Sequence, residues 1–214
     1  MRLLSQNKKM RISSNNKAIV YDFSCGCISN KCLLGNSCYA KNGAYVWSNV
    51  KQALDQKLEA TKKPDFINNM CNEIQQKLKS AKKQQKQLYI RIHSSGDFYN
   101  AEYLLKWLTV CEKFPEVQFY AYTKEVLLLK LFDTYNILPK NFTVIYSMGG
   151  IEDKHIDIDK DRHSKIFESE SDLNKTDYFN AMESDLVALG PNNKIGLIFH
   201  GPKKYKNLIN IQKK

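Results

Sequence analysis

The chain has 214 residues, of which 43% are hydrophobic and 26% are charged, which is the composition of an ordinary globular protein. This composition excludes a disordered or fibrous chain, and the length favours a single domain over residues 1–214. Apolar runs stay below the ~18 residues that cross a membrane, and the first residues are charged where a signal peptide is apolar. We therefore expect a cytoplasmic protein with no membrane partner.

The net charge of +11 is unevenly distributed along the chain. Residues 152–185 hold 11 of the 22 acidic residues and five basic ones, which leaves 28 basic against 11 acidic residues elsewhere. The basic part could bind nucleic acid or a nucleotide through its phosphates. Because only four of the 33 basic residues are Arg, whose planar fork reads guanine, we favour a solvated, Lys-rich surface.

Strand-like and helix-like patterns alternate along the chain. Residues 1–16 are expected to form a flexible segment, and residues 205–214 a flexible basic tail. The expected strands cover residues 17–24, 87–95, 117–124, 142–150, 164–169 and 194–200. The expected helices cover residues 39–62, the stretch from Pro64 to about residue 83, and residues 100–114, 125–135 and 176–189.

This alternation predicts an α/β fold in which mostly parallel strands are covered by helices. Six strands suit a partial or open (β/α)6 TIM-like barrel better than a complete eight-stranded barrel. An N-terminal Cys loop follows the first of these strands. We expect no internal repeat.

Cysteines are concentrated in one loop. Four of the six lie within 14 residues: Cys25, Cys27, Cys32 and Cys38. The segment contains Gly, Ser and Asn and has no apolar periodicity, so packing does not explain its cysteines, and thiolate ligation of a metal does. Cys71 and Cys111 instead lie at helical spacing with apolar residues and are expected in the core.

Polar residues follow the ends of the predicted strands. Ligands of parallel α/β folds bind at the carboxyl ends of the strands, so these residues are site candidates. Besides the Cys loop they are His93, Ser94, Ser95, Gly96, Asp97, Tyr122, Lys124 and His200. We expect one site assembled from several strands.

Four motifs together resemble a known family. They are Cys25, Cys32 and Cys38-Tyr39-Ala40, then RIHSSGDFYN at 91–100, FYAYTK at 119–124 and IGLIFH at 195–200. In this order they resemble the phage gene product 88 family over about residues 20–202. That family in turn resembles radical S-adenosylmethionine (SAM) proteins, in which a three-Cys loop after the first strand holds a [4Fe-4S] cluster.

The resemblance implies that Cys25, Cys32 and Cys38 bind the cluster and that Cys27 is spare. A cluster held by three thiolates leaves one iron free to bind SAM or another substrate. A structural zinc ion prefers four ligands, which all four cysteines of the loop could supply. The sequence leaves both an iron-sulfur cluster and a zinc ion as possible occupants of the loop, and the iron-sulfur cluster is favoured.

The resemblance also implies a SAM site. Ser95, Gly96 and Asp97 stand where radical SAM proteins carry an element that accepts the SAM ammonium, and Tyr122 would lie beside it. Gly96 would allow close approach of the backbone, and Asp97 would be the acceptor. Asp97 could equally cap the helix that begins near Tyr99.

Three residues are candidates for catalysis. His93, Lys124 and His200 each stand at or just beyond a strand end, where they could bind an anion or transfer protons near the metal. The alternatives are a core histidine for His93, an exposed strand-end lysine for Lys124 and a turn histidine for His200.

The leading interpretation is an iron-sulfur protein, a radical SAM-like enzyme of phage or mobile-element origin. Its substrate would be a small molecule or nucleotide that the sequence does not identify, and the oligomeric state stays open. The alternative is a zinc-stabilised protein that binds nucleic acid through its basic surface without catalysis.

Overall fold

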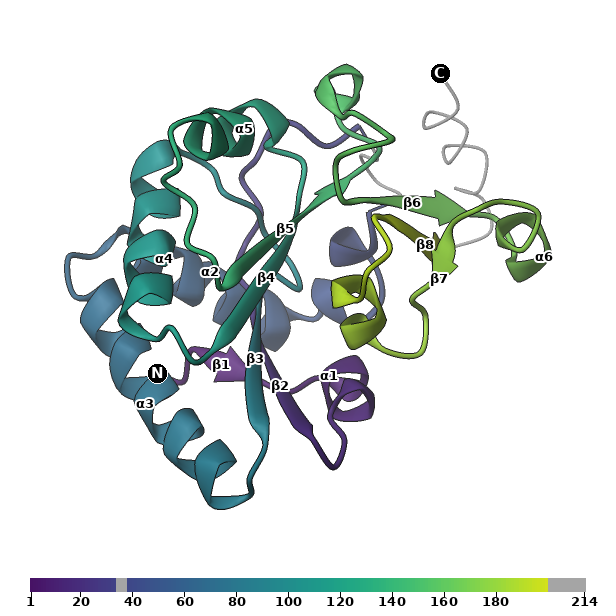
Figure 1. The fold of residues 1–214 in the computed structure, drawn as a ribbon. Coiled ribbons are helices and arrows are strands. Elements are labelled where there is room, and N and C mark those ends of the chain that lie inside the picture. The colour runs from purple at the N-terminus through teal and green to yellow at the C-terminus, as the bar shows by residue number, and fades with distance from the viewer. Residues whose placement is uncertain (34–37, 200–214) are drawn as a thin grey trace.

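A computed structural model describes residues 1–33 and 38–199 of the chain, which form a sheet of eight strands (Figure 1). The strands are β1 (Leu4–Ser5), β2 (Ala18–Phe23), β3 (Gln87–Ile92), β4 (Gln118–Thr123), β5 (Phe142–Ser147), β6 (His163–Phe167), β7 (Phe179–Asn180) and β8 (Lys194–Ile198). Their spatial order is β1-β2-β3-β4-β5-β6-β8-β7. The β1/β2 pair is antiparallel and the other pairs are parallel. With β1 and β7 at its edges, the sheet of the described residues is open.

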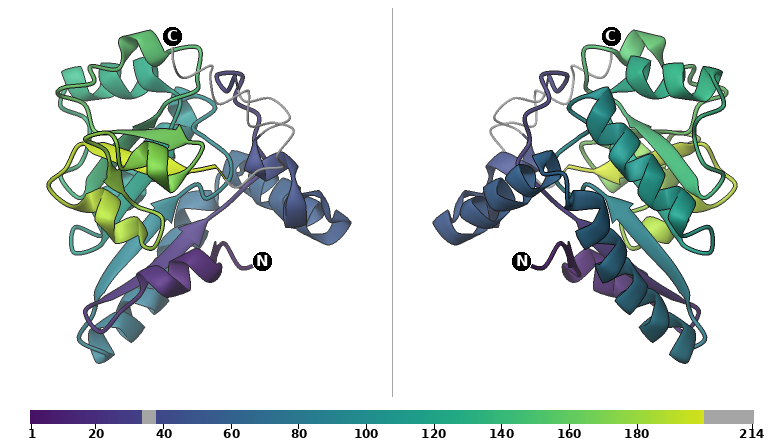
Figure 2. Two further views of the ribbon diagram at one scale, coloured as in Figure 1. Left: turned by 90° about the vertical axis from the view of Figure 1, so that its right-hand side faces the viewer. Right: turned by 90° about the vertical axis from the view of Figure 1, so that its left-hand side faces the viewer.

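The α-helices are α1 (Lys8–Ser13), α2 (Ser48–Lys62), α3 (Phe66–Lys83), α4 (Ala101–Lys113), α5 (Val126–Thr134) and α6 (Glu170–Leu173). The 3-10 helices are η2 (Tyr39–Lys41), η3 (Gly43–Val46), η4 (Asp153–His155) and η5 (Asp185–Leu189). Crossovers between parallel strands are right-handed, so strands joined in spatial order place their helices on one face. Accordingly α3, α4 and α5 cover the same face of the sheet (Figure 1). Figure 2 shows α2 extending away from the sheet.

The main core lies between the sheet and these helices. Phe66, Met70 and Ile74 recur at helical spacing in α3 and are each at most 1% exposed. Phe23 of β2 meets Phe66 and Trp107 edge-on, with ring centroids 6.0 and 5.3 Å apart. Aromatic packing therefore fixes β2 against α3 and α4.

The opposite face of the sheet carries a smaller core beneath α1 and η5, which contains a buried charge cluster. Asp185 is fully buried and accepts bonds from Arg91 Nη1 at 2.8 Å and Tyr120 Oη at 3.0 Å, while Lys9 Nζ lies 2.8 Å away. Burial alone would raise the pKa of Asp185, but the charges of Arg91 and Lys9 bring it below its ordinary value. The carboxylate thus ties α1 and β3 to η5.

The expected α/β class with a mostly parallel sheet is confirmed, and the sheet of the described residues is not closed. The expected helix over residues 176–189 is wrong, because this stretch forms β7 and then η5. The cause is tertiary: Asp185 binds Lys9 and Arg91, which stand far away in the chain. Residues 39–62 form η2 and η3 before α2 begins at Ser48.

Residues 1–16, for which the sequence predicts flexibility, form β1 and α1. Leu4 and Met10 are fully buried, and Asn7 caps α1 by accepting a hydrogen bond from the backbone N–H of Met10 at 3.0 Å. The predicted tail, residues 205–214, lies outside the described residues. None of the described helices is long and apolar enough to cross a membrane.

Asn100, and not Asp97, caps α4, since its side chain accepts a hydrogen bond from Tyr103 N at 2.8 Å. Asn100→Ala is therefore expected to lower the free energy of unfolding by about 1 kcal/mol. Asn100→Asp keeps the acceptor oxygen and is expected to stay close to the wild type. Urea unfolding followed by circular dichroism compares the three proteins, and equal stability of Asn100→Ala and wild type would contradict this cap.

Candidate metal centre

The carboxyl ends of β2 and β3 are joined by hydrogen bonds of the Cys loop, which we define as residues 24–38. Cys25 N–H donates to Ser95 O at 3.0 Å, and Ser95 Oγ donates to Cys25 O at 2.8 Å. Ser94 N–H donates to Phe23 O at 2.9 Å and continues the pairing of the two strands. Ser95, a predicted cofactor ligand, thus holds the first part of the Cys loop in place.

The described part of the Cys loop continues across the ends of β4 and β5. Ser29 Oγ donates to Glu125 Oε1 at 2.6 Å, just after β4. Leu33 N–H donates to Gly149 O at 2.9 Å, and Cys32 forms an antiparallel bridge with Gly150, just after β5. The parallel strands therefore bring the Cys loop to the edge where the predicted site residues of β3 and β4 lie.

Asp97 ties β3 to β4. Its Oδ1 accepts from Thr123 Oγ1 at 2.6 Å, and its Oδ2 accepts from Lys124 N at 2.9 Å. The side chain is 8% exposed, and burial raises the pKa of Asp97 to about 6 although these bonds lower it. The helix-cap interpretation of Asp97 is wrong, and the carboxylate holds the strand ends together.

Lys124 ties β4 to β5 in the same way. Its Nζ donates to Ser147 O at 2.8 Å, Ser147 Oγ at 3.0 Å and Met148 O at 2.8 Å. Burial lowers the pKa of Lys124, while the negative charges of Cys32 and other nearby groups raise it. Since three bonds use the three protons of the ammonium, Lys124 is an anchored cation beside the Cys loop and not an exposed strand-end lysine.

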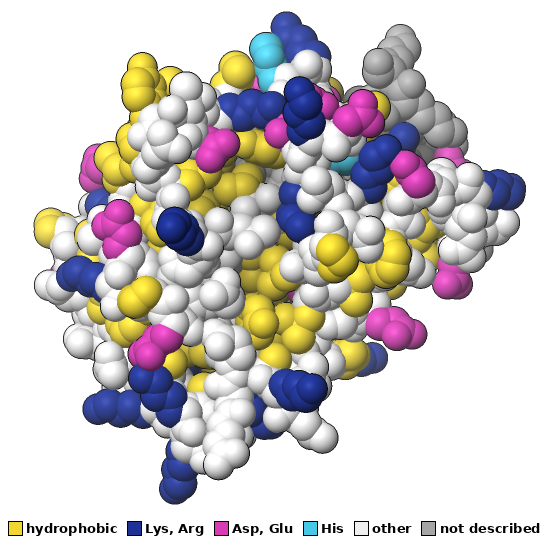
Figure 3. Space-filling view, in the orientation of Figure 1, with side chains coloured by type: hydrophobic (Ala, Val, Ile, Leu, Met, Phe, Trp, Pro, Cys, Tyr) yellow, Lys and Arg dark blue, Asp and Glu magenta, His cyan; other side chains and the backbone are white. Residues whose placement is uncertain are grey.

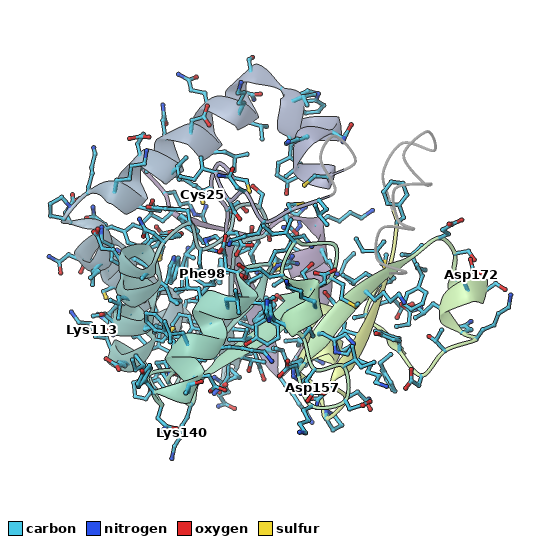
Figure 4. The ribbon with its side chains drawn as sticks, turned by 90° about the horizontal axis from the view of Figure 1, so that it is seen from above. Cys25, Phe98, Lys113, Lys140, Asp157 and Asp172 are labelled. Atoms are coloured by element: carbon cyan, nitrogen blue, oxygen red, sulfur yellow. The ribbon has the colours of Figure 1, made fainter. Side chains whose placement is uncertain are left out.

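Cys25, the first cysteine of the Cys loop, has a fully buried thiol. A Cβ atom on Gly96 would lie 2.7 Å from Cys25 Sγ, so only glycine fits there, and Gly96 also has a φ of +100°. Burial raises the pKa of Cys25 to about 12, while a hydrogen bond with Tyr103 lowers it. In the view of Figure 4, Cys25 lies inside the outline of the molecule, whereas Lys113, Lys140 and Asp172 lie at its margin.

The other three cysteines lie nearer to solvent. Cys27 is exposed, and Cys32 and Cys38 are half-buried. A hydrogen bond between the Cys38 and Cys32 side chains raises the pKa of Cys38, and the charges of Cys32 and Cys27 add to this effect. Within residues 1–33 and 38–199, no three Cys, His, Asp or Glu side chains are already arranged to hold a metal ion.

His93 is a core residue in this structure. It is 2% exposed, and its Nε2 lies 2.8 Å from Tyr103 Oη. Its ring meets Phe98 edge-on at 4.8 Å, and burial lowers the pKa of His93 to about 3, so the ring is neutral at physiological pH. His200, the other catalytic histidine predicted from sequence, lies outside the described residues.

Tyr122 points to the sheet face opposite α3 and α4. The guanidinium of Arg91 lies 4.7 Å from the centre of its ring. Asp22 and Arg91 are register partners on β2 and β3, and their charges, together with that of Cys38, act on the hydroxyl of Tyr45. This polar group adjoins the Cys loop. In the sequence, this group is indicated by Asp22 and Arg91, two charged residues inside otherwise apolar strands.

Figure 3 shows how charged side chains are distributed on one face of the molecule. Lys and Arg side chains are dispersed mostly around the edge of this face, and acidic side chains lie among them. Hydrophobic side chains gather toward its middle. On this face, charges of both signs are therefore interspersed.

The fold and the candidate site define a class: an open, mostly parallel α/β protein with a Cys-rich loop at the carboxyl edge of its sheet. The chain belongs to the Gene product 88 family, whose profile matches residues 2–210. The resemblance to phage gene product 88 proteins is thereby confirmed. No curated protein and no solved structure matches the chain.

The raised pKa of Asp97 predicts a dependence of stability on pH. An acid whose pKa is higher in the folded than in the unfolded chain stabilises the fold at low pH, and this contribution is lost as the pH rises from 3.8 through about 6. The stability advantage of the wild type over Asp97→Asn is therefore expected to shrink over this interval. Urea unfolding at several pH values measures it, and a constant difference would disprove the prediction.

The contact between Gly96 and Cys25 predicts a coupling between the two positions. Gly96→Ala is expected to lower the free energy of unfolding by more in the wild type than in a Cys25→Ala background, because removing Sγ relieves the 2.7 Å approach. Residues in contact couple by about 0.5–3 kcal/mol. A double-mutant cycle by urea unfolding measures the coupling, and additive effects would show that the two residues do not touch.

Proposed function

We propose that this protein is an iron-sulfur protein whose Cys loop holds a [4Fe-4S] cluster, as in radical SAM-like enzymes. The observation that carries the proposal is that the Cys loop crosses the carboxyl edge of the sheet, where Cys32 forms a bridge with Gly150 just after β5 and the Cys38 side chain interacts with that of Cys32. Soft thiolates are the ligands that iron-sulfur clusters use. They lie at the carboxyl ends of parallel strands, where α/β proteins bind ligands.

The thiols of the Cys loop are the type of ligand that an iron-sulfur cluster requires. Ligation requires thiolates, and the pKa values of Cys27 and Cys38 are both raised, so metal binding would release their protons. Lys124 supplies a fixed positive charge near Cys32 and Cys38, which favours the thiolate form of both.

A bound [4Fe-4S] cluster with three protein ligands supplies an iron with an open position and, when reduced, an electron for a substrate such as SAM. Around it, this chain would provide shape and charge. Gly96 keeps the end of β3 free of a side chain, and Asp97 fixes the backbone of Lys124. The order of the strands supports a relation to partial TIM-like barrels, whose ligands bind at this edge.

The face that carries Arg91 and Tyr122 is where we place the substrate, a small molecule or nucleotide. Tyr45 links this face to the Cys loop, since the charges of Arg91, Asp22 and Cys38 all act on its hydroxyl. Arg91 is held by Asp185, so its guanidinium is positioned before any substrate arrives.

Anaerobic reconstitution with ferrous iron and sulfide tests the proposal. The wild type is expected to bind iron and sulfide in equal amounts and to show a broad visible absorbance that changes on reduction by dithionite. A variant with all four loop cysteines replaced by Ser is expected to bind neither. Cys71→Ser, a matched substitution of a half-buried cysteine outside the loop, should bind like the wild type. Stoichiometric zinc alone in the wild type, with no iron retained, would refute the proposal.

A further inference from the structure

The four cysteines of the Cys loop differ sharply in their surroundings. Cys25 is fully buried, and both its backbone N–H and its carbonyl are bonded to Ser95. Tyr103 acts on its thiol, and the Tyr103 hydroxyl lies 2.8 Å from His93 Nε2. A metal at Cys25 would have to enter the core, because the thiol is fully buried and Gly96 packs so closely that a Cβ there would lie 2.7 Å from Sγ.

Cys27 stands two residues further along and is exposed. The charges of Asp97 and Cys32 act on its thiol, and a hydrogen bond from the Ser29 backbone lowers its pKa, although burial still raises it. Cys27 also acts on Cys38, whose side chain contacts that of Cys32. Cys27, Cys32 and Cys38 thus act on one another electrostatically, and all three are more accessible to solvent than Cys25.

We propose that the three metal ligands are Cys27, Cys32 and Cys38, and that Cys25 is a buried packing residue beneath the centre. The inference rests on the proposed function for the nature of the metal and revises the ligand set that the family resemblance implies. Making Cys25 a ligand would require a fully buried thiol, packed against Gly96, to become accessible to the metal. Cys27 reaches the site without such a cost, because its side chain already lies outside the core.

Cys25 and Cys27 form a matched pair for the test, since they are the same residue type in the same loop. In the full-length chain, Cys25→Ala is expected to retain the iron and sulfide content of the wild type after anaerobic reconstitution, with a lower unfolding temperature. Cys27→Ala, Cys32→Ala and Cys38→Ala are each expected to weaken iron binding at least about tenfold. Iron and sulfide analysis and the electron paramagnetic resonance signal of the reduced protein report the loss without any activity assay.

A second measurement needs no substitution and covers the case that Cys25→Ala does not fold. The native metal-free wild type is alkylated with iodoacetamide, and the sites are read by peptide fragmentation. Cys27 is expected to react readily and Cys25 to react only on unfolding. After loading with iron and sulfide, or with cobalt(II) as a thiol-binding probe, Cys27, Cys32 and Cys38 are expected to be protected together.

The outcomes separate the two proposals. Loss of iron in Cys25→Ala with normal iron in Cys27→Ala, or continued alkylation of Cys27 in the loaded wild type, would overturn the ligand set and leave an iron-sulfur protein. A wild type that binds neither iron with sulfide nor cobalt would overturn the proposed function and the ligand set with it. Normal loading of Cys25→Ala with protection of Cys27 supports both.

Discussion

Parallel pairing of β2, β3, β4 and β5 in chain order is the constraint on which the rest of the structure depends. It sends the crossover helices α3, α4 and α5 to one face and the carboxyl ends of these strands to one edge (Figure 1). These three helices leave the other face of the sheet uncovered. Two segments remote in the chain cover it, α1 and η5, and the buried pair of Asp185 with Arg91 and Lys9 joins them to the sheet. A single topological choice thus produces both the main core and the charged cluster opposite it.

The same pairing explains why polar residues crowd the carboxyl edge without all belonging to a ligand site. Strand ends leave backbone groups without ladder partners, and these groups must be satisfied where water is excluded. Asp97 accepts the backbone N–H of Lys124, and Lys124 in turn donates to the carbonyls of Ser147 and Met148. The end of β3 is therefore tied to that of β4 by Asp97, and the end of β4 to that of β5 by Lys124. The rigidity of this edge comes from residues that resemble catalytic groups in the sequence.

Sequence periodicity predicts most of the strands and helices, and it predicts less of the contacts at the carboxyl edge of the sheet. The strands around Val20, Ile90 and Phe119 follow from apolar patterns, and so do the class and the parallel direction. The apolar pattern does not predict η5, because this helix forms where Asp185 contacts Lys9 of α1 and Arg91 of β3. His93 likewise has a strand-end position that suggests chemistry, and only the aromatic packing of the folded protein shows that its ring is buried. Local patterns do not encode contacts between distant segments.

The cysteines of the Cys loop differ in burial, and this difference distinguishes their thiols more clearly than their spacing in the sequence does. A thiol under a close-packed glycine is costly to ionise, whereas a thiol near an anchored lysine is stabilised as a thiolate. Cys25 meets the first condition, through Gly96, and Cys32 and Cys38 lie near Lys124, although the interaction between their own side chains still raises the pKa of Cys38. Because Lys124 is fixed by β5, its charge stays in place whether or not a metal is bound. The edge that holds the strands together therefore also fixes a positive charge beside Cys32 and Cys38.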